Sequence, residues 1–234
     1  MSSEFKTLFF FLLLLRCTIS TPPSESFIFN GFTDANLKLD GVAFITSDGL
    51  LELTNATRQM QGHAFHPNPL KFKSPTGKIL SFSTTFVFAI LSEISDLSGH
   101  GIAFVVSRTR NLSSALPSQY LGLFNISNNG NASNHVFAVE LDTILSSEFN
   151  DISDNHVGID VNSLKSSSSH DAGYYDNKTG VFKNLTLISG QPMQLWVDFK
   201  GEEMELNVTL SPIRMPKPNK LINPSCRRKL IFRA

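Results

Sequence analysis

The sequence VELDTILSSEFNDISDNHVGIDVNS, residues 139–163, combines two strand patterns with four potential metal ligands. Polar and apolar residues alternate around Glu140 and Asp142, so a strand here sends both carboxylates to one face. A second strand pattern starts at His156, and Asp151 lies in the loop between them. Because like charges repel unless a cation lies between them, and because carboxylates with an imidazole suit an ion such as Mn²⁺, the stretch predicts a metal site. Taken singly, the same residues fit a solvated acidic loop with a surface histidine.

Short alternating runs separated by turn residues recur along the rest of the chain, and long helical periodicity is absent. The predicted strands are residues 50–53, 79–90, 101–106, 136–142, 156–161, 185–188, 195–199 and 204–210. With 234 residues, they predict one antiparallel all-β sandwich. Many of the 20 phenylalanines, together with Trp196, are expected in its core. The serine-rich residues 164–170 are expected to form a mobile surface loop.

The pattern VELDT, a short acidic loop and then NHVGIDVNS resembles the metal-binding core of the legume lectins. The stretches GHGIAF, residues 99–104, and MPKP, residues 215–218, resemble the extracellular lectin domains of plant L-type lectin receptor-like kinases. Residues 27–32 resemble the first strand of that family, 101–104 a central strand and 120–124 the loop after it. The resemblance implies a concanavalin-like jelly-roll sandwich. It weakens after Pro218, which implies that the chain is C-terminally truncated and lacks its last strands, with marginal stability as the consequence.

This resemblance also implies where two ions bind. It places the metal ligands at Glu140, Asp142, Ile144, Ser146, Asp151 and His156. The glutamate, the two aspartates and the histidine would hold Mn²⁺, and the two aspartates would also hold Ca²⁺ with the carbonyl of Ile144. Ser146 stands where the family has an asparagine ligand of Ca²⁺. Because a hydroxyl is shorter than an amide, we expect a weakened Ca²⁺ site.

The resemblance implies non-enzymatic carbohydrate binding, but the sugar site departs from the family pattern. The family's sugar-binding aspartate corresponds to His100 and its asparagine to Ser146. Its loop glycine falls near Ser118 or Gln119. An aspartate accepts two strong hydrogen bonds from adjacent hydroxyl groups, whereas a neutral histidine offers one acceptor and one donor. We therefore expect a degenerate monosaccharide site, with glycans or other cell-wall or extracellular ligands as partners.

Two alternatives belong to other functional classes. The altered sugar loops favour a module that binds a protein or a hydrophobic ligand instead of a sugar. A β-glucan hydrolase with the same architecture would carry the motif Glu-x-Asp-x-x-Glu, which Glu140 and Asp142 begin. Leu145 occupies the position of the second glutamate, and a retaining glycosidase needs two carboxyl groups. The sequence therefore predicts that the chain is not an enzyme.

The chain ends and the composition predict an extracellular product. Residues 1–20 read as a secretory signal, residues 24–216 as the legume-lectin-like domain, and residues 217–234 as a divergent basic tail. Sequons for N-glycosylation, which fit the secretory route, occur at Asn55, Asn111, Asn125, Asn131, Asn177, Asn184 and Asn207.

Charge and cysteine content limit the partners further. Lys plus Arg and Asp plus Glu both number 20, so the overall charge favours neither nucleic acid nor an anionic membrane, and no apolar stretch is long enough for a membrane span. Removal of the signal with Cys17 would leave Cys226 without a partner for an internal disulfide. A homodimer is a further expectation.

Overall fold

The computed structural model describes residues 26–92 and 98–221. The chain divides into two units, residues 1–30 and residues 31–234. The described part of the first unit is short, and the rings of Phe27 and Phe29 lie 5.5 Å apart within it. The following paragraphs concern the second unit.

Several sequence predictions concern residues near the two ends of the chain. Residues 27–32, expected to form the first strand, contain no strand, so this prediction is wrong. The predicted signal at residues 1–20, both cysteines and most of the predicted basic tail lie outside the described residues.

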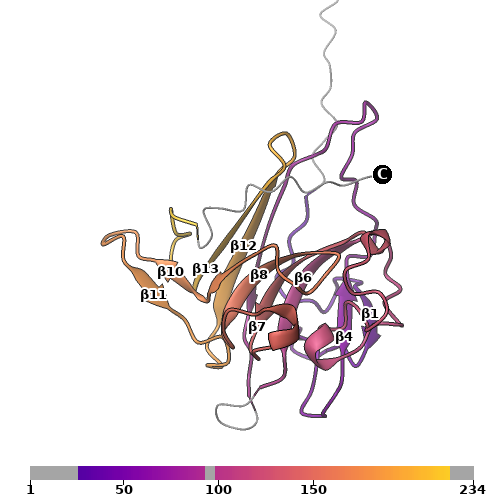
Figure 1. Ribbon diagram of the computed structural model, residues 1–234, viewed down its shortest axis with the longest axis horizontal. Coiled ribbons are helices and arrows are strands. Elements are labelled where there is room, and N and C mark those ends of the chain that lie inside the picture. The colour runs from indigo at the N-terminus through magenta and orange to yellow at the C-terminus, as the bar shows by residue number, and fades with distance from the viewer. Residues whose placement is uncertain (1–25, 93–97, 222–234) are drawn as a thin grey trace, which may run out of the picture. The chain divides into compact units, whose positions relative to one another are not determined.

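A four-stranded antiparallel sheet forms the centre of the second unit (Figure 1). Its strands are, in spatial order, β6 (Gly101–Ser107), β7 (Val136–Asp142), β8 (His156–Val161) and β9 (Ser168–Asp171). The boundaries of β7 and β8 are those predicted from their alternating patterns. The surface loop predicted at residues 164–170 is wrong, because Leu164 is buried and β9 pairs with β8, with Ser169 opposite Gly158.

A second antiparallel sheet has the order β13 (Glu205–Pro212), β12 (Met193–Lys200) and β5 (Phe82–Phe88). Along β12 buried and half-buried residues alternate, and Leu195 and Val197 face the core. Trp196 lies between them and therefore points to the opposite face, beside Thr85 and Thr209 of the neighbouring strands. The prediction that Trp196 belongs to the core is wrong.

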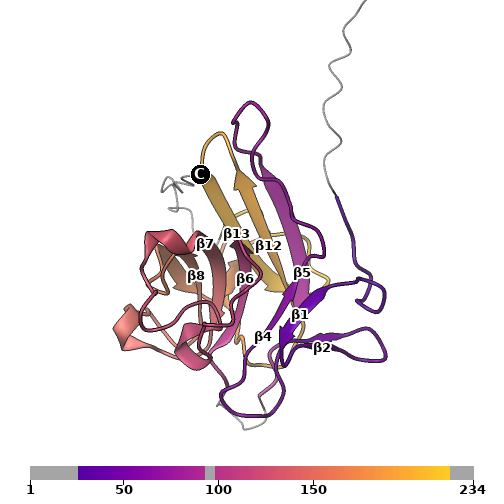
Figure 2. The same ribbon diagram turned by 90° about the vertical axis from the view of Figure 1, so that its right-hand side faces the viewer.

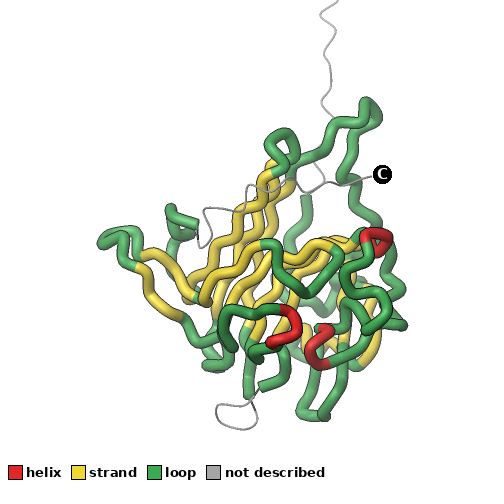
Figure 3. Tube along the Cα trace, in the orientation of Figure 1, coloured by secondary structure: helices red, strands yellow, loops and turns green. Residues whose placement is uncertain are grey.

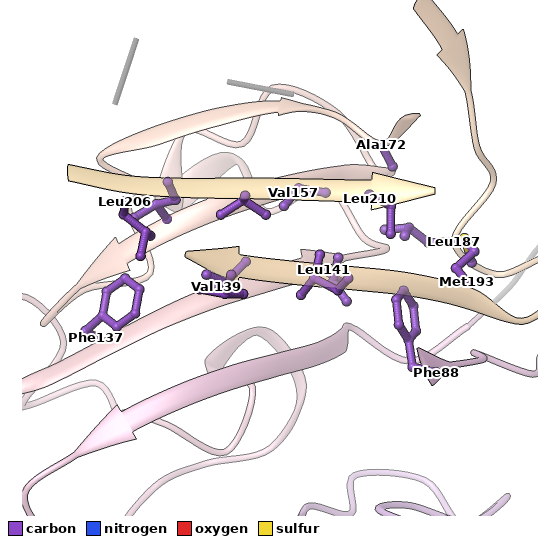
Figure 4. Close-up of a cluster of buried hydrophobic side chains, with 14 of the residues drawn as sticks. Phe88, Phe137, Val139, Leu141, Val157, Ala172, Leu187, Met193, Leu206 and Leu210 are labelled. Carbon is purple, nitrogen blue, oxygen red and sulfur yellow. The ribbon is translucent and has the colours of Figure 1, made fainter. Parts of the chain in front are cut away.

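The main core lies between these two sheets. Figure 4 shows Val139 and Leu141 of β7 with Leu206 and Leu210 of β13 in this cluster. Phe88, Phe137 and Phe199 are buried in the same cluster, and further phenylalanines pack at its margin. Burying these side chains supplies the main driving force for the fold, at about 25 cal/mol per Å² of apolar area. The predicted antiparallel all-β sandwich is confirmed.

A second apolar cluster covers the other face of the four-stranded sheet. It includes Val136 and Ala138 of β7 and the loop residues Leu123, Phe124 and Phe149. All seven residues of β7 are buried, because one face meets the main core and the other meets this cluster. Glu140 and Asp142 continue the second face, so they lie beneath the loops.

Short ribbons and single helical turns complete the second unit (Figures 2 and 3). The ribbons pair β1 (Lys38–Gly41) with β4 (Gly62–Phe65), β2 (Phe44–Ile45) with β3 (Leu51–Glu52), and β10 (Gly173–Tyr175) with β11 (Phe182–Asn184). The helical turns are η1 (Ser118–Tyr120), η2 (Ala132–Asn134) and η3 (Ser147–Phe149). The strand predicted at residues 185–188 does not form, because β11 ends at Asn184.

Candidate metal centre

The pairing of β7 with β8 brings three of the predicted metal ligands together. Asp142 lies opposite His156, and Glu140 lies opposite Gly158. The ligand atoms of Glu140, Asp142 and His156 all lie within 4.8 Å of one another, and all three residues are buried. This geometry rules out the solvated acidic loop with a surface histidine for these three residues.

The imidazole of His156 is oriented by a second hydrogen bond. Its Nδ1 lies 2.8 Å from the carbonyl oxygen of Ser153, and a carbonyl only accepts, so Nδ1–H donates. Nε2 is thereby directed toward Glu140, whose Oε1 lies 3.3 Å away. A histidine that donates one ring nitrogen to a carbonyl and presents the other to carboxylates has the arrangement typical of metal ligands.

The electrostatics of this cluster favour a bound cation. Burial raises the pKa of Asp142 to about 7, and the charge of Glu140 adds to that rise against the hydrogen bond from the Ile144 amide. Burial alone would lower the pKa of His156, but the hydrogen bond and charge of Glu140 outweigh it and raise the pKa to about 9. The rise for His156 comes from Glu140, whereas the rise for Asp142 comes first from burial and then from the negative charge of Glu140. A divalent cation would neutralise it, so the donor set fits an ion.

Two further residues join the cluster that the sequence did not single out. Ser166 Oγ donates to Glu140 Oε1 at 2.5 Å and lies 2.9 Å from Asp160 Oδ1. Asp160 is fully buried, which raises its pKa well above the usual value, and the charge of Glu140 raises it further. The alternation of β8 places His156, Gly158 and Asp160 on one face, a signal that could have identified Asp160. Nothing in the sequence points to Ser166, which reaches the site through the turn between β8 and β9.

The loop between β7 and β8 contains the other predicted metal ligands. The Ile144 amide donates to Asp142 Oδ1, and the Ser146 amide donates to Asp151 Oδ2, both at 2.7 Å. Asp151 is outside the group of three ligands that lie within 4.8 Å of one another, yet its raised pKa, caused first by burial, also responds to the charges of His156 and Glu140. The hydrogen bond to Asp151 curls the loop over the cluster and leaves Ser146 buried.

The predicted sugar-binding residues lie on loops that are linked to this one. His100 is half-buried, and its carbonyl oxygen accepts from the Thr143 amide at 3.3 Å. Burial lowers the pKa of His100, and the charge of Glu148 opposes that change. Gln119 lies in η1, whose Tyr120 ring packs edge-on against Phe149 of η3, with the ring centres 5.7 Å apart. Contacts therefore join the loops that carry His100, Gln119 and Ser146, the last of which follows Asp142 directly.

The predicted glycosylation sites differ in exposure. The exposed ones are Asn55, Asn111, Asn131, Asn177 and Asn184, and the half-buried ones are Asn125 and Asn207. The side-chain amide of Asn125 donates to the Ser114 carbonyl at 2.9 Å, so its nitrogen is already engaged.

Comparison with known proteins agrees with this fold and this cluster. A legume lectin domain model matches residues 24–230, and the chain therefore belongs to the legume lectin family. The family resemblance inferred from the sequence is confirmed.

Curated relatives with similar sequences include plant receptor kinases. The chain is 56% identical over 218 residues to the L-type lectin-domain containing receptor kinase SIT2 of Oryza sativa subsp. japonica, covering 90% of this chain and 32% of the relative. It is 56% identical over 217 residues to receptor kinase IV.1 of Arabidopsis thaliana, covering 92% of this chain and 32% of that protein. The chain thus spans about a third of the length of these relatives.

Solved lectins share the fold. Lectin II from Ulex europaeus is 27% identical with a TM-score of 0.69, over 85% of this chain and 81% of that one. A structure of the Ulex lectin UEA-II with galactose gives a TM-score of 0.68 at 27% identity, over 85% of this chain and 81% of that chain. Peanut lectin bound to a nine-residue peptide gives a TM-score of 0.64 at 26% identity, over 81% of this chain and 77% of that one.

Proposed function

We propose that this legume lectin domain binds carbohydrate without cleaving it, and that divalent cations hold its recognition loops. The observation that carries the proposal is the buried group of Glu140, Asp142 and His156 beneath the linked loops. A cation in that group would fix the loop that starts at Thr143, and through it the loops with His100 and Gln119. The solved relative in complex with galactose supports a sugar as the class of ligand.

The ligand roles follow from the donor set. Glu140 and His156 would hold Mn²⁺, and Asp142 and Asp151 would serve both Mn²⁺ and Ca²⁺. The Ile144 carbonyl and the Ser146 side chain would complete a weakened Ca²⁺ site. The ions would supply charge neutralisation and fixed loop geometry, while the chain's own side chains would contact the ligand.

The sugar contacts we propose are His100, Gln119 and Ser146, a degenerate form of the family site. His100 has a pKa lowered by burial, which favours the neutral ring with one donor and one acceptor. This chemistry suits a glycan that offers one hydroxyl group at this position rather than the adjacent pair that an aspartate grips.

A glycan array tests this function. The mature chain is applied with Ca²⁺ and Mn²⁺, with a chelator, and with free sugar as competitor. We expect binding to glycan spots that is lost on chelation and is inhibited by free sugar. Native mass spectrometry before and after dialysis against the chelator reports in parallel whether ions are bound at all.

A module for a protein or hydrophobic ligand is the second candidate, and the altered position at His100 favours it. Binding that survives both chelator and free sugar would select this alternative and reject the lectin function. For cleavage, Glu140 and Asp142 are buried and Leu145 replaces the second glutamate, which argues against a glycosidase. Release of sugars from β-glucan by the purified chain would contradict us.

We propose that the domain works outside the cell, as a secreted, N-glycosylated product that acts alone or as a homodimer. The predicted signal at residues 1–20, the predicted domain at residues 24–216 and the exposed sequons support this location. Within residues 26–92 and 98–221, no helix has the length and apolar character needed to cross a membrane. A glycosidase that lowers the mass of the chain purified from plant cells would support the secretory route.

A further inference from the structure

The loop of residues 116–124, which carries Gln119, has an unusual backbone. It is closed on itself by two hydrogen bonds, from the Leu116 amide to the Phe124 carbonyl and from the Gly122 amide to the Leu116 carbonyl. Three of its residues have left-handed φ angles, namely Ser118 at 62°, Leu121 at 49° and Gly122 at 67°. Because residues other than glycine rarely adopt this conformation, surrounding contacts must hold the loop in place.

Those contacts come from the ribbon of β1 and β4. His63 in β4 is buried, and its Nε2 lies 2.8 Å from the carbonyl oxygen of Gly122. Because a carbonyl only accepts, Nε2–H must donate, and the opposite nitrogen, Nδ1, faces Asp40 of β1 at 3.5 Å. Gln61, the residue before β4, donates its side-chain amide to the Ala115 carbonyl at 3.2 Å. Side chains at and just before the start of β4 therefore bind the residue that precedes the loop, Ala115, and a residue near its end, Gly122.

The fit between ribbon and loop is close. A Cβ atom on Gly122 would lie 2.8 Å from His63 Nε2 and 3.3 Å from the Cβ of Gln61, so only glycine allows the loop to approach this near. The loop also contains Tyr120, whose ring packs on Phe149 of η3. The ribbon therefore contacts the loop at Gly122, and η3 contacts it at Tyr120.

We infer that Gln61 and His63 are positioning residues for ligand recognition: they hold the 116–124 loop in the conformation that presents Gln119. The effect on recognition rests on the proposed function, because the position of this loop matters for recognition only if the loop contacts a ligand. The anchoring itself is measurable without any ligand.

The test uses hydrogen exchange of the peptide covering residues 116–124, in the whole chain with Ca²⁺ and Mn²⁺. His63→Leu keeps about the same side-chain volume and removes the donor, whereas His63→Gln places an amide donor near the same point. We expect the loop amides of His63→Leu to exchange about tenfold faster than in the wild type, since a buried carbonyl loses its partner. His63→Gln should restore slow exchange, and His66→Leu, beyond the end of β4, should leave the loop unchanged.

Binding of the same variants to the glycan array measures the effect on ligand recognition. The spots bound by the wild type should weaken about tenfold with His63→Leu and recover with His63→Gln, in line with the loss and return of one buried hydrogen bond. Equal exchange in His63→Leu and wild type, or failure of His63→Gln to rescue either readout, would overturn the inference. Gln61→Met, at a half-buried position, provides the same test if His63→Leu does not fold. If the wild type binds no glycan, the proposed function fails, and the exchange data alone show whether His63 holds the loop.

Discussion

Gly158 lies opposite Glu140 in the pairing of β7 with β8, beside the side chains of the candidate metal site. A Cβ atom at this position would lie 2.2 Å from Glu140 Oε1 and 2.1 Å from Ser166 Oγ. Gly158→Ala must therefore displace the carboxylate that the cluster needs. Both atoms lie at the ends of side chains, but they are hydrogen-bonded to each other and Glu140 is buried. Moving either atom would therefore break a buried hydrogen bond.

Overpacking of this kind costs about 1–3 kcal/mol of folding stability. For a domain of this size, each kcal/mol lowers Tm by about 2–4 °C, so we expect a fall of roughly 2–12 °C without added metal. Displacing a ligand should weaken Mn²⁺ binding by at least the 10–100-fold that loss of a supporting contact typically costs. The expected signature is a modest stability loss with a large loss of metal-induced stabilisation.

Thermal melts with and without Mn²⁺, together with native mass spectra, measure both effects. Gly99→Ala is the matched control, because a Cβ there meets no atom of the described residues within 4 Å. If Gly158→Ala kept the wild-type melting temperature and bound Mn²⁺ as tightly as Gly99→Ala, the assignment of Glu140 to a metal site would be refuted.

Three other predictions follow from the same cluster. The pKa of Asp142 is raised from 3.8 to about 7 and that of His156 from 6.5 to about 9, so the folded state holds more protons than the unfolded state between about pH 4 and pH 9. Melts of the chelator-treated chain should therefore show Tm falling over that range, while stabilisation by Mn²⁺ grows. A flat profile would contradict this. Ser146→Asn should tighten Ca²⁺ binding by about 1 kcal/mol, near fivefold, in calorimetry, because the longer amide reaches the ion, and weaker binding would count against the Ca²⁺ role. Asp151→Asn keeps an oxygen that can accept a hydrogen bond from the Ser146 amide but loses the negative charge. We therefore expect Mn²⁺ occupancy in native mass spectra to fall about tenfold or more while Tm changes little. Unchanged occupancy would remove Asp151 from the ligand set.

The sequence predicts those parts of the site that depend on strand alternation. Glu140 and Asp142 alternate with Val139 and Leu141, and that period alone places the two carboxylates on one face. The start of β8 at His156 then brings the imidazole across from Asp142. These contacts depend on neighbouring strands, so local pattern is enough to predict them.

Contacts between distant segments could not be predicted in the same way. Ser166 lies in a run of serines with no periodic signal, and its role appears only when the turn after β8 folds back over Glu140. His63 precedes its partner Gly122 by 59 residues, and no local pattern joins them. Trp196 lies outside the core because a bulky aromatic residue on a strand fits either face, and in β12 the aliphatic residues Leu195 and Val197 occupy the core face.

The burial of β7 on both faces has an evolutionary consequence. Selection for a new ligand ordinarily works on exposed loops, where substitutions leave the scaffold untouched. Here a substitution at Glu140 or Asp142 would change the proposed ion site and would also replace a buried side chain, so changes at these positions are constrained by folding whatever the ligand. Diversification should instead be concentrated at His100 and Gln119, which border the same centre without belonging to the interior.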